Sequence, residues 1–191
     1  MKKLILTSLM AVFAVSTANA ATNYFVGGSA AFEAANGDND TAWSVAPEFG
    51  WHLNDKWDAG LALGLSYDNS TVNVDEYTYG AEGFARYKMA QFGAFSVLLD
   101  GRVGAYAMTL DDDKNTETVW GIGAEVSPMV TYNLSDSFTL YAKLNFLGAR
   151  AEYVFKNKDL GVGNSWEFAA FGDSSNVMNT DDFKIGFYYN F

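Results

Sequence analysis

The chain has 191 residues, of which 12 are basic and 23 acidic, giving a formal net charge of −11, and it contains no cysteine. The acidic balance argues against nucleic-acid partners, and the lack of cysteine excludes a disulfide framework and a thiol-linked lipid anchor. Aromatic residues make up 16% of the chain, a composition that favours extensive contact with an apolar environment.

The first residues have the three-part pattern of a secretory signal peptide. Two lysines precede an apolar run over 4–15, and small residues follow up to Ala20. The run is shorter than the roughly 20 residues that a membrane-spanning helix needs, which disfavours a transmembrane anchor. We therefore predict a signal peptide over 1–20 and an exported domain over 21–191. An exported chain without a spanning helix can still cross a membrane with strands closed into a barrel.

Eight later segments alternate apolar or aromatic residues with small or polar ones, which is the period of a β-strand. The clearest is 41–53, where Trp43, Val45 and Phe49 share one face and Glu48 and Gly50 the other. The first segment alternates weakly but has strand-like composition. In chain order, the predicted strands are 24–32, 41–53, 57–67, 77–89, 95–107, 120–132, 138–146 and 183–191.

The connections between these segments alternate between long and short. The long ones are 33–40, 68–76, 110–117 and 148–181, and the short ones are 54–56, 90–94 and 133–137. An even number of strands with this asymmetry is typical of bacterial outer-membrane barrels, which have tight periplasmic turns and longer external loops. The pattern predicts an all-β fold, an eight-stranded antiparallel up-and-down transmembrane β-barrel with both ends of the domain on the periplasmic side.

The faces of the predicted strands distinguish a membrane barrel from a soluble one. A soluble sandwich or lipocalin-like barrel also alternates, but its outer face would carry charges densely. Here the polar face combines small residues such as Gly60, Gly64 and Gly123 with few charges. Aromatic residues gather at strand ends, as in the aromatic girdles of membrane barrels. We therefore expect the apolar face to contact lipid.

Two prolines lie inside predicted strands, at Pro47 and Pro128. Proline cannot donate a ladder hydrogen bond and is normally found at edges or bulges. A bulge or a missing ladder bond is predicted at both positions.

The exported domain resembles the small outer-membrane β-barrel family of the OmpA transmembrane domain and OmpX-like proteins. The resemblance is carried by the signal peptide, the eight segments, the turn regions 51–57 and 132–138, and the aromatic C-terminal strand. It implies a bacterial outer-membrane location, reached through the periplasm, among outer-membrane lipid and lipopolysaccharide. It also implies that the barrel-assembly machinery recognises the terminal strand, here through Phe187, Tyr189 and Phe191. A monomer without a cofactor is expected.

The inward faces of a barrel in this orientation collect charged side chains of both signs. They are Glu48, Glu82, Arg86, Lys88, Asp100, Arg102, Glu125, Lys143 and Lys184. An eight-stranded barrel has an interior just wide enough for side chains to fill, and buried charges need partners. We predict a paired network that plugs the lumen, with Glu82–Arg86 and Asp100–Arg102 as its first pairs. A narrow charged pore is the alternative.

Enzymatic chemistry is the second class of function, because some small outer-membrane barrels modify lipids. Such chemistry needs a positioned base near a nucleophile or an activated water. The chain has one histidine, His52, next to a predicted short turn with Asp55 and Asp58 nearby. No catalytic triad is recognisable, so a structural histidine and no catalytic residue are predicted. The acidic run 111–113 lacks the glycine and glutamate of a calcium loop, so no metal site is predicted.

A third hypothesis is an OmpW-like transporter of small hydrophobic molecules, whose lumen should be apolar. Only Phe84, Leu98 and Met129 are sizeable apolar residues at inward positions, so this hypothesis ranks below a structural role. The connection 148–181 is too apolar for simple solvent exposure. It could fold over the barrel mouth, extend the last two strands outward, or contact a surface ligand such as a host or phage protein.

Overall fold

The computed structural model describes residues 23–34, 41–71, 74–111, 116–144, 147–155, 163–171 and 183–191, and these residues form ten strands. The strands are β1 (Tyr24–Ala34), β2 (Thr41–His52), β3 (Trp57–Thr71), β4 (Val74–Phe92), β5 (Phe95–Asp111), β6 (Thr116–Asn133), β7 (Phe138–Leu144), β8 (Gly148–Val154), β9 (Ser165–Phe171) and β10 (Phe183–Asn190). The predicted signal peptide over 1–20 lies outside the described residues.

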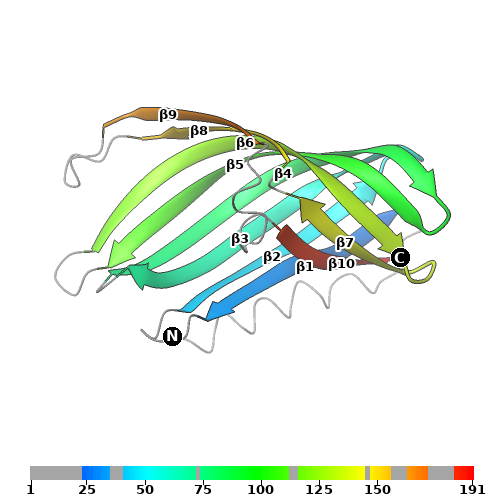
Figure 1. Cartoon of the computed structure of the whole chain (residues 1–191), viewed down its shortest axis with the longest axis horizontal. Helices are drawn as coiled ribbons and strands as arrows, with labels where there is room; N and C mark the ends of the chain where they lie inside the picture. The colour runs from blue at the N-terminus through cyan, green and yellow to red at the C-terminus, as the bar shows by residue number, and fades with distance from the viewer. Residues whose placement is uncertain are drawn as a thin grey trace.

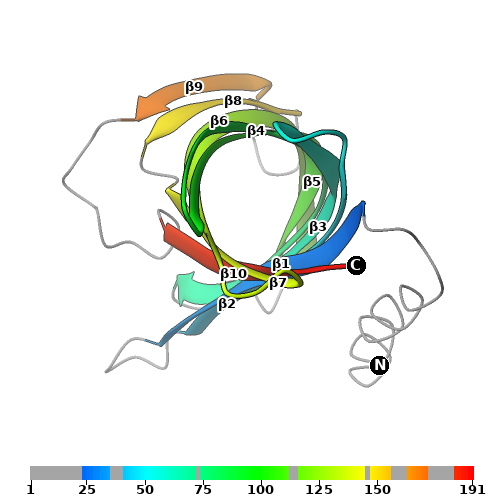
Figure 2. The ribbon, with the colours of Figure 1, turned by 90° about the vertical axis from the view of Figure 1, so that its right-hand side faces the viewer.

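Eight of these strands close into an antiparallel barrel, which confirms the predicted fold class. Neighbours pair in the order β1 to β7, and β10 closes the ring between β7 and β1. Figure 2 looks along the barrel and shows the closed ring, with β8 and β9 outside it. The described residues include no helix long and apolar enough to cross a membrane.

The two ends of the barrel differ in their connections. The turns at 53–56, 93–94 and 134–137 share one end with the start of β1 and the last residue of the chain, and this is the turn end (Figure 1). The opposite end is the loop end. Alternation sets the two faces: Leu61, Val103 and Ile185 are exposed on the outer face, whereas Ala62, Arg102 and Lys143 are buried in the lumen.

The strands near the loop end are longer than predicted, so two of the expected long connections are shorter than predicted. Within the expected loop 68–76, β3 continues to Thr71 and β4 begins at Val74. Within the expected loop 110–117, β5 continues to Asp111 and β6 begins at Thr116. Polar cross-strand contacts support these extensions. The Tyr67 hydroxyl donates to Asp75 over 3.0 Å, and the Thr109 and Thr118 hydroxyls lie 3.1 Å apart. Polarity marked these segments as loops, although paired polar residues stabilise an extended hairpin equally well.

The predicted connection 148–181 also contains strands, as in the alternative that extended the last strands outward. β8 runs in the same direction as β7, since both are antiparallel to β6, and β8 also pairs with β9. Gly148 opens β8 with a φ of 158°, and a side chain there would collide with the Val126 carbonyl oxygen. The close approach of the two backbones therefore requires glycine at this junction.

The prolines lie where one ladder is interrupted, as predicted. Pairing of β2 with β3 stops at Val45↔Leu65 and resumes in the same register at Glu48↔Ala62, so Pro47 is skipped. Pro128 lies where the partner of β6 changes from β8 to β7. Proline has no backbone N–H to donate to the ladder, and at both positions the interrupted pairing does not need that donor.

Candidate functional site

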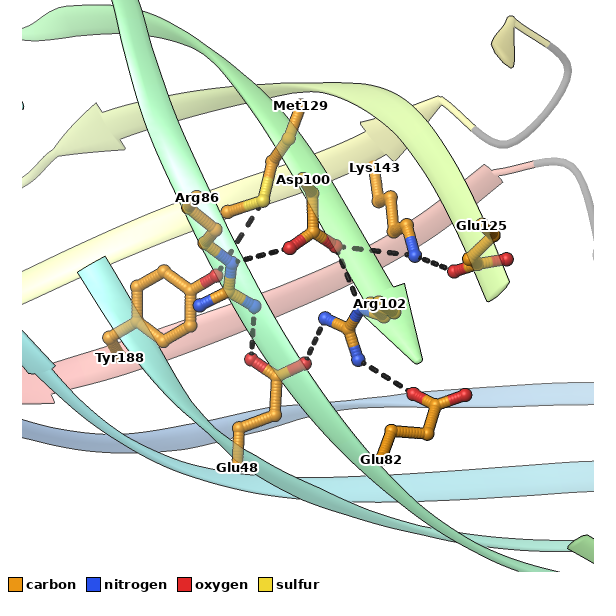
Figure 3. Close-up of polar contacts among 9 residues, drawn as sticks. All are labelled: Glu48, Glu82, Arg86, Asp100, Arg102, Glu125, Met129, Lys143 and Tyr188. Carbon is orange, nitrogen blue, oxygen red and sulfur yellow. Dashed lines mark hydrogen bonds and ion pairs between the residues drawn. The ribbon is translucent and has the colours of Figure 1, made fainter. Parts of the chain in front are cut away.

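The centre of the lumen holds two arginines and two carboxylates in a closed ring of ion pairs (Figure 3). Arg86 donates to Glu48 from Nη2 over 2.6 Å and to Asp100 from Nε over 3.0 Å. Arg102 donates to Glu48 from Nη2 over 2.5 Å and to Asp100 from Nε over 2.7 Å. Each carboxylate therefore accepts from both guanidinium groups, one on each oxygen.

This ring is almost completely shielded from solvent. The side chains of Glu48, Arg86 and Asp100 are at most 1% exposed, and that of Arg102 is 7% exposed. Withdrawing charges from water is costly unless each has a well-oriented partner. The fork shape of arginine supplies two directed donors per residue, which is why arginine rather than lysine suits both cationic positions.

Three further charges extend the ring toward the loop end. Arg102 also donates to Glu82 over 3.2 Å, and the Lys143 ammonium lies 3.3 Å from Asp100 and donates to Glu125. Glu82 and Glu125 are 40% and 30% exposed, so they mark the boundary between the buried network and the loop-end hollow.

The structure brings most of the predicted lumen charges into this one network. Its members are Glu48, Glu82, Arg86, Asp100, Arg102, Glu125 and Lys143. Among the described residues, Lys88 and Lys184 form no ion pair. Lys88 lines the hollow at the turn end, and Lys184 lines the one at the loop end, opposite Lys143 in register.

The predicted Asp100–Arg102 pair forms, but the predicted Glu82–Arg86 pair is wrong. These two residues are four positions apart on β4, a separation of about 13 Å along a strand. Asp100 lies directly opposite Arg86 in the ladder between β4 and β5 and so becomes its partner. Glu82 pairs instead with Arg102, which reaches it diagonally from β5.

Aromatic side chains surround Arg86 in the lumen, and of these only Phe84 was named among the predicted inward residues. Its guanidinium carbon lies 4.0 Å from the ring centre of Phe84, 5.0 Å from Tyr188 and 5.8 Å from Phe25. Tyr141 stacks on Tyr188 with ring centres 4.5 Å apart. Cation–π contacts strengthen when they are desolvated, so these rings stabilise the buried cation as well as filling space.

A second missed cluster lies at the loop end. The Tyr106 hydroxyl donates to Glu152 on β8, and Arg150 pairs with Glu167 on β9 over 3.3 Å. These acidic and basic residues fall in the segment that was predicted as a loop. The alternation of Ala149, Ala151 and Tyr153 with Arg150 and Glu152 was the signal that could have identified the strand.

The charge network separates two hollows in the lumen. The loop-end hollow, of about 350 Å³, is bordered by Glu82, Arg102 and Glu125. The turn-end hollow, of about 510 Å³, is bordered by Arg86, Leu98 and Met129. No residue lines both hollows, so the buried ring and its aromatic neighbours form a partition across the barrel.

His52 lies at the turn end, on the lumen side of β2. Its Nδ1 is 2.7 Å from the Asp58 carboxylate, and its Nε2 is 3.3 Å from the side-chain oxygen of Asn190. Asn190 in turn donates to the Thr139 hydroxyl over 3.3 Å. Both ring nitrogens thus have structural partners that link β2 and β3 to β10 and β7. Within the described ranges, no group of three or more carboxylate or imidazole side chains is placed to hold a metal ion.

Replacement of His52 by alanine is expected to lower the free energy of unfolding by no more than about 1 kcal/mol, because partly exposed ion pairs contribute little. Urea titration of the protein in lipid vesicles measures this change. A loss of several kcal/mol would show that the link between β2 and β10 is a major support of the barrel.

The predicted assembly residues lie on or just after β10. Phe187 and Tyr189 are 42% and 45% exposed on the outer face. The Phe187 ring stacks against Phe138 at 5.5 Å, and Phe191 contacts Tyr189 at 5.0 Å. Recognition of these residues by assembly machinery stays a prediction.

Comparison with known proteins identifies the fold. No family model and no curated protein matches the sequence. The chain is similar in structure to Neisserial surface protein A, with a TM-score of 0.59 and 18% identity over 91% of this chain and 100% of that one. It is also similar to the N-terminal β-barrel domain of Pseudomonas aeruginosa OprF, with a TM-score of 0.52 and 13% identity over 89% and 98% of the two chains. The chain therefore has the eight-stranded fold of small outer-membrane β-barrels that the sequence resemblance implied.

Proposed function

We propose that this chain is a non-enzymatic integral outer-membrane protein of a Gram-negative cell envelope, with a plugged lumen and a structural or surface-contact role at its loop end. The observation that carries the proposal is the buried ring of Glu48, Arg86, Asp100 and Arg102, which lies between two separate hollows. A water-filled channel would leave these side chains hydrated, whereas they are almost fully buried.

Location and partners form part of the same proposal. The apolar outer face and the aromatic residues at the strand ends suit a bilayer with lipopolysaccharide in its outer leaflet. The predicted signal peptide supports export through the periplasm, and the outward aromatics of β10 support recognition by the barrel-assembly machinery. In this orientation the turn end faces the periplasm and the loop end faces outward. The protein is proposed to be a monomer.

The surroundings of the single histidine support a role without catalysis. His52 contacts Asp58 and Asn190, neither of which is a nucleophile of the serine or cysteine type. A second role as a conducting pore would need a continuous water path through the ring of ion pairs.

Recording from single barrels in planar bilayers tests the plug. The wild-type protein is expected to give no stable open conductance. The charges of the partition are already paired across the lumen, so the side chains stay in place and keep it closed. A charge-neutral variant in which Glu48, Arg86, Asp100 and Arg102 are all alanine is expected to conduct, since it joins the two hollows. Heat-dependent mobility on gels verifies that this variant is folded. A stable open state of the wild-type protein would instead establish a pore.

A further inference from the structure

Strands β8 and β9 form a wing that continues the outer wall of the barrel beyond the closed ring (Figures 1 and 2). The ladders run without interruption from the wall into the wing. Ala124 of β6 lies opposite Ala151, which lies opposite Phe168. In the next row, Ile122 lies opposite Tyr153, which lies opposite Trp166.

The two faces of the wing differ sharply in polarity. Trp166 and Phe168 on the outer face are 77% and 75% exposed, and no charged residue occurs on that face among the described residues. Arg150, Glu152 and Glu167 all lie on the opposite face, on the same side as the barrel lumen, and pair with one another. An exposed apolar face of this kind marks a contact surface.

A furrow crosses the outer wall and ends at the wing. It encloses about 630 Å³ and is lined mainly by small or apolar side chains. From the middle of the wall to the wing they include Ala85, Gly101, Val103, Ala124, Ala151 and Phe168. Arg102, Glu125 and Arg150 border the furrow as well, and their charged groups pair on the lumen side. Because most of the lining side chains are small, they leave an apolar hollow in the outer wall, where larger residues such as Leu61 and Leu63 project outward.

The length of the strands places the wing at the edge of the bilayer. A membrane strand needs about 9–11 residues to cross the hydrocarbon core. On β6, the stretch from Tyr132 near the turn end to Ile122 has about this length, so the crossing is complete at the row of Ile122, Tyr153 and Trp166. Tryptophan and tyrosine favour this boundary, which is where Tyr153 and Trp166 lie.

We propose that the furrow seats a hydrocarbon chain of an outer-leaflet lipid, and that the aromatic face of the wing rests on the same lipid at the membrane boundary. The proposal deepens the proposed function and rests on its membrane location. Continuity with the lipid-facing wall identifies the occupant as lipid. The absence of charge on the outer face of the described wing makes the acyl chain, and not a phosphate, the recognised group.

Fluorescence quenching tests the contact of the wing with lipid. The full chain, with Trp166 as its only tryptophan, is inserted into phosphatidylcholine vesicles whose acyl chains carry bromine. A matched variant keeps only Trp57, on the outer face at the turn end. We expect the bromolipid to quench both residues. Quenching of Trp57 alone would overturn the proposal, because the wing would then stand in water. Quenching of neither would overturn the membrane location and, with it, the proposed function.

Filling the furrow tests the seat itself. Ala151→Phe occupies the hollow, whereas Ala81→Phe adds the same bulk to an outward position of β4 outside it. After extraction from phosphatidylcholine vesicles, native mass spectrometry is expected to show one retained lipid on the wild-type protein and on Ala81→Phe. The Ala151→Phe variant is expected to lose it. Equal retention by all three proteins, or retention by none, would overturn the seat.

Discussion

Replacement of Arg86 by methionine is expected to lower the free energy of unfolding by about 3–5 kcal/mol, the usual cost of breaking a buried ion pair. Methionine fills space beside Phe84 and Met129 but leaves Glu48 and Asp100 each with one arginine instead of two. The loss arises from the remaining buried negative charge and not from a cavity. Equilibrium unfolding in urea, with the barrel in lipid vesicles, measures the change.

Two further variants identify electrostatics as the cause. Lys88→Met alters another lumen cation of β4 that has no ion-pair partner among the described residues, and it should change stability by less than about 0.5 kcal/mol. Adding Glu48→Gln to Arg86→Met restores the charge balance and should recover most of the loss. If Arg86→Met and Lys88→Met lower the free energy of unfolding by the same amount, water must reach the network. The description of a sealed partition would then be wrong.

The closed barrel could be predicted because each strand has a different environment on each face. A period of two along a segment such as 41–53 records those environments in the sequence without any knowledge of neighbouring strands. The set of lumen charges could be predicted for the same reason. Glu48, Arg86 and Asp100 all fall on the polar side of their segments.

Partner choice within the lumen could not be predicted, because it depends on register and on the barrel radius. A sequence does not state that Asp100 lies opposite Arg86, or that Arg102 reaches back to Glu82. Part of the aromatic filling follows from the period of two, because Phe84, Tyr141 and Tyr188 share the polar side of their segments with Arg86, Lys143 and Lys184. The packing of these rings and of Phe25 around Arg86 could not be predicted, because it depends on the narrow bore, in which bulky rings fill the space beside the charges.

Valine at position 186 is expected to prevent the barrel from closing. Gly186 of β10 lies between Ser29 of β1 and Tyr141 of β7 in the ladders. A β-carbon at this position would collide with the Gly28 carbonyl oxygen and with the Tyr141 ring. The ring could turn only by leaving its stack on Tyr188, and the carbonyl belongs to the backbone and cannot move without breaking the pairing of β1 with β10.

The folded form is expected to be missing when Gly186→Val is refolded into vesicles and run without heating on a gel, where folded barrels migrate differently from unfolded chains. Gly64→Val is the matched control, because Gly64 also faces the lumen but a β-carbon there meets no atom within 4 Å. This control should fold like the wild-type protein, since its added methyl groups enter the loop-end hollow. A folded Gly186→Val barrel would mean that the seam between the first and last strands yields by a shift of the backbone. In that case, close packing of Tyr141 against β10 would not be required for closure.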